Sequence, residues 1–233
     1  MRAGGRRRDR APFSRRTETP DVTDTTPAER RTRAVQERLR AHGDDAAVLF
    51  PSHNLQYTTG FSEEPGERHL LAFLPAEGDP VFLVPELSAR QVRQASWIDD
   101  VRAWRDTDDP AEQVAAVVAD LGLDGGHVLV DDTMHARFTQ DLRAAAPRLT
   151  FGLASEVLAP LRIRKDDTEL DALRRAAAAA DATVADLRAL GADAVGLTET
   201  ELAERLTDRL ATHGGTGVSF EPIVAAGPNG AMP

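Results

Sequence analysis

The sequence predicts a three-layer α/β domain over residues 27–155, and three observations lead to this fold class. Short apolar runs alternate along this stretch with longer segments whose apolar residues recur at helical spacing. Two of the longer segments carry helix start signals, Thr26-Pro27-Ala28-Glu29 and Asp109-Pro110-Ala111-Glu112. The chain has 233 residues, 41% of them hydrophobic, which is enough to bury a core. Strands that alternate with helices are typical of a sheet with helices on both faces.

The individual elements follow in order from these patterns. Strands are expected where apolar runs are bounded by turn residues, at Ala46–Phe50, His69–Leu74, Pro80–Val84, Asp100–Trp104, Val128–Val130 and Leu149–Leu153. Helices are expected from Pro27 to near Gly43, over Glu86–Ala95, from Pro110 through Leu121, and around Phe138 and Leu142. The segment that carries Asn54, Tyr57 and Gly60 is expected to be a polar loop, in which the glycine adopts a positive φ angle.

The composition changes after about Pro160, where we expect a domain boundary. Residues 161–164 are interpreted as a short connection. Two helices are expected next, an alanine-rich one capped by Asp166 and a second one capped by Thr198. Val218–Ala225 is predicted to be a strand and residues 227–230 a turn. The expected organisation is therefore a tail over 1–25, a first domain over 26–160 and a second segment over 161–233.

The first 16 residues carry seven arginines and one aspartate, Asp9. Such a head could bind nucleic acid or an anionic membrane, and Ser14-Arg15-Arg16 is similar to the start of a twin-arginine export signal. The polar sequence TETPD follows in place of an apolar stretch, which argues against export. No basic patch with interleaved aromatic residues occurs later in the chain. We therefore expect a disordered tail over 1–25 and neither nucleic acid nor a membrane as a partner.

The whole chain has a formal net charge of −10 although its head is basic, and Lys165 is its one lysine. An acidic, lysine-poor and alanine-rich body is typical of proteins adapted to high salt. A GC-rich genome, which favours arginine and alanine codons, explains the same composition, and the sequence leaves both explanations open.

A search for catalytic motifs finds no active site. The sequence has no Walker loop, no GxGxxG after a strand, no GxSxG and no HExxH. The absence of cysteine excludes disulfides, thiolate zinc sites and a cysteine nucleophile, and a cytoplasmic location is the default expectation. The six histidines are scattered, so each is interpreted as a surface or capping residue. We assign no catalytic residue and no metal ligand in this chain.

Three segments nonetheless resemble one known family, the prolidase-like (Xaa-Pro) metallopeptidases, which include aminopeptidase P and creatinase. Their sequences are SHNLQYTTGF at 52–61 followed by GER at 66–68, LRIRKDDTEL at 161–170, and SFEPIVAAGPNGAMP at 219–233. The first is similar to a loop of creatinase and prolidase N-terminal domains, and the other two to the start and a later segment of the catalytic domain. The chain's only two asparagines, Asn54 and Asn229, fall at asparagines of these motifs.

The resemblance implies a fold and an activity. It implies a creatinase/prolidase N-terminal domain with a mixed sheet, followed by an incomplete α+β pita-bread domain. Family members hydrolyse the bond before proline with two divalent metals, and manganese, cobalt and zinc are all plausible. Two aspartates, one histidine and two glutamates hold these metals, and all would lie downstream of Pro233, as would a further histidine that follows the Ala-x-Pro step. This chain is therefore expected to be inactive as given, a fragment of a homodimeric enzyme that acts on proline-containing peptides. A creatinase-like C–N hydrolase and a non-enzymatic dimerisation or interaction remnant are the alternatives.

The resemblance also suggests roles for single residues. In the family the loop after the first motif can reach the active site of the neighbouring subunit, so Phe61 and Arg68 are candidates for lining the substrate. For Tyr57 and Phe61 core packing is an equally good explanation, and Arg68 could be only a solvated surface charge. The remaining motif residues are predicted to be structural, and they are Asn54, Tyr57, Gly60, Phe220 and Asn229.

Overall fold

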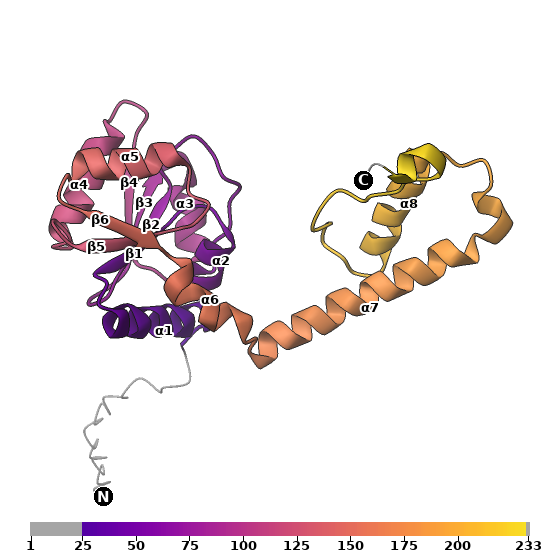
Figure 1. The fold of residues 1–233 in the computed structure, drawn as a ribbon, viewed down its shortest axis with the longest axis horizontal. Coiled ribbons are helices and arrows are strands. Elements are labelled where there is room, and N and C mark those ends of the chain that lie inside the picture. Colours follow the sequence, from indigo (N-terminus) through magenta and orange to yellow (C-terminus); the bar gives the residue numbers. More distant parts are fainter. Residues whose placement is uncertain (1–24, 232–233) are drawn as a thin grey trace, which may run out of the picture. The chain divides into compact units, whose positions relative to one another are not determined.

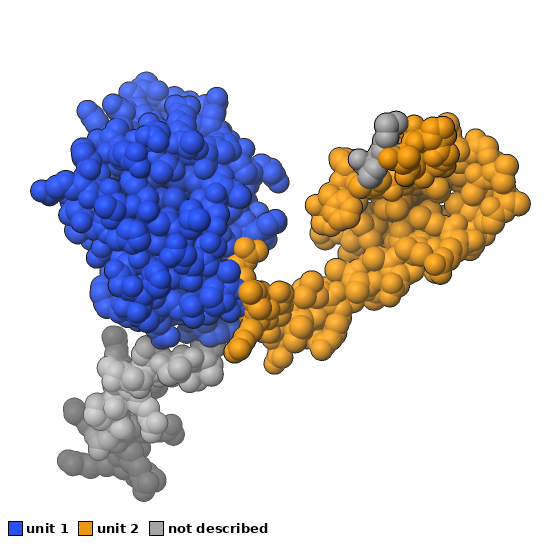
Figure 2. All heavy atoms as spheres, in the orientation of Figure 1, with its two compact units in different colours: residues 1–161 blue, residues 162–233 orange. Residues whose placement is uncertain are grey.

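The computed structural model of the protein describes residues 25–231, which fall into two compact units. Unit 1 runs to Leu161 and unit 2 begins at Arg162; they are blue and orange in Figure 2. The tail predicted over 1–25 lies, except for Thr25, outside the described residues. No helix in the described range is long and apolar enough to cross a membrane.

Unit 1 is built on one six-stranded sheet whose order is β4-β3-β2-β1-β5-β6. The strands are β1 (Ala46–Leu49), β2 (Leu71–Pro75), β3 (Val81–Pro85), β4 (Asp100–Trp104), β5 (His127–Val130) and β6 (Thr150–Leu153). β2 pairs antiparallel with β1 and β3, and the other neighbouring pairs are parallel. Five strands therefore point the same way and β2 opposes them, so the sheet is mixed. The carboxyl ends of those five strands lie along one edge of the sheet.

Six helices accompany the sheet, and Figure 1 shows α4 and α5 on the opposite side of it from α1 and α6. The helices are α1 (Pro27–His42), α2 (His53–Thr59), α3 (Glu86–Ala95), α4 (Pro110–Asp120), α5 (Ala136–Ala145) and α6 (Ser155–Ile163). The predicted caps are present, since the Thr26 side chain accepts a hydrogen bond from Glu29 N and Asp109 accepts one from Ala111 N. The arrangement confirms the predicted three-layer α/β class.

Two apolar clusters, one on each face of the sheet, make up the core. Alternate residues of each central strand go to opposite clusters: in β1, Ala47 and Leu49 face the helices α1, α2, α3 and α6, while Val48 faces α4 and α5. Buried strands with no polar face are expected in a sheet that is covered on both sides. The fold is therefore held by burial within residues 35–158.

Two helices differ from the sequence-based expectation. Residues 53–59, predicted as a loop, form α2, because Ser52 Oγ caps it by accepting from the backbone N–H groups of Asn54 and Leu55. Residues 161–163, predicted as part of a connection, end α6, which contains Pro160. A proline removes one backbone donor, and the helix keeps its place because Val157 and Leu158 are fully buried in the core.

Unit 2 contains two long helices and two short 3₁₀ segments. They are α7 (Asp167–Ala189), α8 (Glu199–Thr212), η1 (Gly191–Ala194) and η2 (Gly227–Ala231). Capping boxes start both long helices, at Asp166 with Glu169 and at Thr198 with Glu201, as predicted. Little of this unit is buried: among its described residues only Ala179 and Thr183 are.

The predicted strand Val218–Ala225 is wrong. The structure assigns no regular element to this segment, and Phe220 and Ile223 are about 71% and 69% exposed. A strand needs a neighbouring strand to pair its N–H and C=O groups, and the described part of unit 2 contains none. The apolar run is therefore present without the partners that would make it a strand.

Candidate functional site

The first motif lies at the carboxyl ends of β1 and β5. Ser52 follows β1 and its Oγ donates to Asp131 Oδ2 at 2.6 Å, while Asn54 Nδ2 donates to the same oxygen at 3.3 Å. Asp131 directly follows β5, is 3% exposed, and its N–H donates to Val48 O of β1. These bonds fix the start of α2 to the end of β5. Asn54 is part of this partly buried polar junction, and carboxyl ends of parallel strands are where open α/β sheets bind ligands.

Asp131 was not singled out from the sequence. The sequence feature that could have identified Asp131 is an acidic pair, Asp131-Asp132, which comes immediately after a buried strand. What the sequence could not show is that its partners, Ser52 and Asn54, lie 79 and 77 residues away.

The other residues of this motif set the shape of the following loop. Gly60 ends α2 with φ +81°, as predicted, and a Cβ there would come 3.2 Å from Ala95 O. Tyr57 is partly buried, and the guanidinium of Arg31 lies 4.6 Å from its ring centre. Phe61 is 3% exposed and packs edge-on against Phe82, with 6.2 Å between the two ring centres. This burial favours the core-packing explanation for Phe61.

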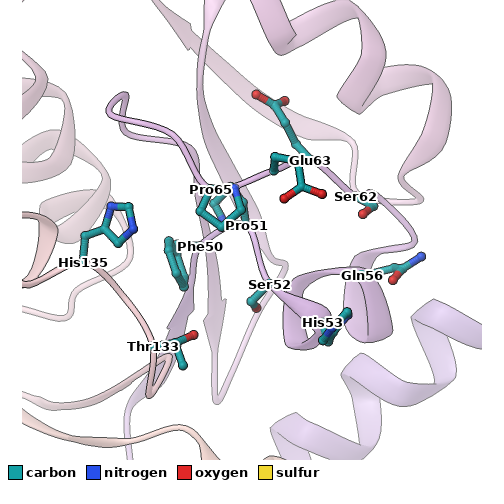
Figure 3. Close-up of a pocket in the computed structure, with 11 residues that line it drawn as sticks. Phe50, Pro51, Ser52, His53, Gln56, Ser62, Glu63, Pro65, Thr133 and His135 are labelled. Carbon is teal, nitrogen blue, oxygen red and sulfur yellow. The ribbon is translucent and has the colours of Figure 1, made fainter. Parts of the chain in front are cut away.

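A cavity of about 380 Å³ opens beside this junction (Figure 3). Figure 3 shows His53 and Gln56 on α2, Thr133 and His135 after β5, and Glu63 on the loop that follows Phe61. The further lining residues are Phe50, Pro51, Ser52, Ser62, Glu64 and Pro65. Carboxylates and imidazoles beside proline and phenylalanine rings make a surface that can bind a small ligand with both a cationic and an apolar part.

Arg68 lines a second cavity of about 200 Å³, which shares Pro51, Glu63 and Glu64 with the first. The Arg68 guanidinium makes two hydrogen bonds to Asp106, at 3.0 and 3.1 Å. These bonds raise the pKa of Arg68 and lower that of Asp106. Both side chains are exposed, so the pair contributes little to stability, and an anionic ligand could compete for the guanidinium. Leu87, which is 81% exposed, lies on the same cavity.

His69 anchors the end of this loop, and the prediction that it is a surface or capping residue is wrong. Its side chain is 3% exposed, its Nε2 lies 2.9 Å from Asp141 Oδ2, and its ring lies against Phe138. Trp104 Nε1 donates to the His69 carbonyl at 2.9 Å. Burial lowers the pKa of His69 below its ordinary value, and Asp141 opposes that shift.

This buried histidine predicts a stability change in mild acid. Since the folded pKa is lowered, the unfolded chain takes up the proton more readily, so His69 costs stability as pH falls below about 6.5. The stability advantage of wild type over His69→Gln should shrink between pH 8 and pH 5, by no more than about 1.4 kcal/mol per pH unit. Urea unfolding across this range measures it, with the exposed His53→Gln as the matched control. If the difference in stability between wild type and His69→Gln stays constant with pH, the lowered pKa of His69 in the folded protein is contradicted.

The motif residues of unit 2 occupy different environments. Phe220 is largely exposed. Asn229 Nδ2 donates to Glu199 Oε2 at 2.8 Å, and Ala226 N donates to Glu199 Oε1 at 2.6 Å. Asn229 is thus hydrogen-bonded to the first residue of α8.

A catalytic metal has no evident site in this part of the chain. Among residues 25–231 no group of three or more histidine, aspartate and glutamate side chains is arranged to hold a metal ion. The residues present do not fit the two-metal centre that the resemblance implies.

Comparison with known proteins agrees with these structural features. Residues 31–164 match the creatinase/prolidase N-terminal domain, and residues 171–233 match metallopeptidase family M24. The probable dipeptidase PepE of Mycobacterium bovis is 35% identical over 189 residues, which are 80% of this chain and 48% of that protein. The Xaa-Pro dipeptidase of Lactobacillus helveticus is 29% identical, over 85% of this chain and 54% of that protein.

A solved structure extends the likeness to the fold. The crystal structure of recombinant prolidase from Thermococcus sibiricus superimposes with a TM-score of 0.82 at 29% identity, covering 89% of this chain and 56% of that chain. The chain spans about half the length of the curated relatives it matches. The matches to both family models, which fall in the order of the two structural units, show that this chain belongs to the creatinase/prolidase family of Xaa-Pro peptidases.

Proposed function

We propose that this chain supplies the N-terminal domain and the first part of the catalytic domain of a peptidase that cleaves the bond preceding proline. The observation that carries the proposal is the consecutive match of its two parts to the creatinase/prolidase N-terminal domain and to the M24 metallopeptidases. The relatives that it resembles include a protein named Xaa-Pro dipeptidase. By itself the chain is expected to be inactive, because its described residues form no group that could hold a metal.

The loop 61–70 and its two cavities are proposed to line the substrate site. Glu63 and Glu64 offer carboxylates to the amino group of a peptide, and Arg68 offers a guanidinium to its carboxylate. Phe61 is buried, so it would help to set the conformation of this loop from the core side. Because no group of three or more histidine, aspartate and glutamate side chains in the described part of unit 1 is arranged to hold a metal ion, the loop would act at a catalytic centre outside it. Such a centre on a neighbouring subunit would make the enzyme a homodimer.

A chimera tests the proposal: residues 1–233 of this chain joined to the remaining C-terminal part of the Mycobacterium bovis PepE protein. It should release proline from Xaa-Pro dipeptides with manganese, cobalt or zinc, and a chelator should abolish the activity. A folded, metal-loaded chimera that cleaves only creatine would favour the C–N hydrolase. One that cleaves neither would favour the non-enzymatic remnant.

In the same chimera, Arg68→Ala should raise KM roughly 10- to 150-fold and leave kcat within a factor of about three, since a lost charge-assisted contact costs roughly 1.5–3 kcal/mol. Asp106→Ala is the matched variant. If Arg68 binds substrate, freeing it from Asp106 leaves KM unchanged or lowers it. If Arg68 only anchors the loop, both variants raise KM alike, and the substrate role of Arg68 is excluded. Arg90→Ala, an exposed arginine of α3, controls for loss of positive charge.

A further inference from the structure

Glu199 makes an interaction that its position in α8 does not require. It is the first residue of the helix, where Thr198 and Glu201 already form the capping box. The Glu199 carboxylate instead accepts two hydrogen bonds from the last described segment of the chain. The donors are Ala226 N at 2.6 Å and Asn229 Nδ2 at 2.8 Å. These contacts join residues 27 and 30 positions apart.

Little else holds that segment. Residues 216–231 contain no buried side chain, and three of their apolar residues, Val218, Phe220 and Ile223, are exposed. Within the described chain, the side-chain hydrogen bonds that connect 216–231 to the helices of unit 2 are the two made by Glu199. Both hydrogen bonds stabilise the ionised carboxylate and therefore lower the pKa of Glu199. The bond from Ala226 N contributes more to this shift than the bond from Asn229.

We infer that Glu199 is a positioning residue, which fixes the Gly227–Ala231 turn by binding the Ala226 N–H and the Asn229 side chain together. One carboxylate oxygen sets the backbone where the turn begins, and the other holds the side chain at its centre. The catalytic purpose of this arrangement rests on the proposed function, because the family segment that resembles 219–233 continues to a histidine.

A reciprocal exchange of charge and amide tests the inference in the 233-residue chain. Asn229→Asp places two carboxylates together, so it should speed amide hydrogen exchange at Ala226 roughly tenfold. Glu199→Gln replaces charge-assisted hydrogen bonds by weaker neutral ones, since its amide can still accept from Ala226 N and donate to the Asn229 amide oxygen, so its effect should be smaller. In the double variant Glu199→Gln/Asn229→Asp the new amide oxygen can still accept from Ala226 N, and its NH₂ group can donate to the carboxylate introduced at position 229. The double variant should therefore restore wild-type exchange. Glu204→Gln, an exposed glutamate on the same helix, should leave it unchanged.

Two results would overturn the inference. The first is an Ala226 amide that exchanges at the unprotected rate in the wild type. The second is a pair of single variants whose effects add in the double variant without rescue. In an active chimera, Asn229→Asp should lower kcat more than it raises KM, and the double variant should restore kcat. An active chimera indifferent to Asn229→Asp would exclude a positioning role for Glu199. An inactive chimera would speak against the proposed function alone, because the exchange measurement requires no activity.

Discussion

Residues 25–163 expressed alone should unfold in one cooperative transition, whereas residues 164–233 alone should show none. Both apolar clusters lie between Val35 and Leu158, so the first fragment keeps the entire core. Among the described residues of the second fragment only Ala179 and Thr183 are buried, which is too little to offset the conformational entropy of about 1–2 kcal/mol per ordered residue. Urea unfolding followed by circular dichroism and tryptophan fluorescence measures the first fragment, and circular dichroism alone the second.

A shorter fragment provides the matched comparison. Ending unit 1 at Ala154 removes Val157 and Leu158, which are 1% and 0% exposed in the core of the α1 face. Burial of two such side chains contributes roughly 3–6 kcal/mol, so residues 25–154 should be less stable than residues 25–163 by about that amount. Equal stability of the two fragments, or a cooperative transition in 164–233, would contradict the division between the units.

Local signals in the sequence were sufficient for most of unit 1. Apolar runs predicted all six strands to within a few residues. The central strands have few polar residues because they are buried on both faces, whereas the edge strands β4 and β6 also carry exposed residues. The caps at Thr26 and Asp109 predicted where two helices begin, because a capping side chain acts on backbone groups two or three residues away. Such interactions are local and can be found by spacing alone.

The errors in the prediction have different physical causes. The α2 segment was predicted as a polar loop because Asn54 and Gly60 are typical of loops, yet Ser52 caps it as a helix and Leu55, Thr58 and Thr59 are buried. Pro160 suggested a boundary, but α6 continues past it because its apolar side packs on the core. Val218–Ala225 has the composition of a strand without a partner strand in the described unit.

The candidate site was predictable only in part. The motif located Asn54 and Gly60 and the loop that carries Arg68, but not the residues that hold them. Ser52 meets Asp131 across 79 residues and His69 meets Asp141 across 72, and no local pattern encodes such pairings. The ion pair of Arg68 with Asp106, across 38 residues, also became visible only in the structure.

The measurement that tests the central claim most directly is a titration of the purified 233-residue chain with manganese, cobalt and zinc, combined with an assay for proline release. The claim, which is part of the proposed function, is that this chain has the fold of the family and that its residues 25–231, in which no group of three or more histidine, aspartate and glutamate side chains is arranged to hold a metal ion, do not bind the catalytic metals. We expect no tight divalent-metal binding and no cleavage of Xaa-Pro dipeptides or longer Xaa-Pro peptides, under conditions in which the Lactobacillus helveticus Xaa-Pro dipeptidase is active. Metal-dependent release of proline by the 233-residue chain itself would contradict the claim.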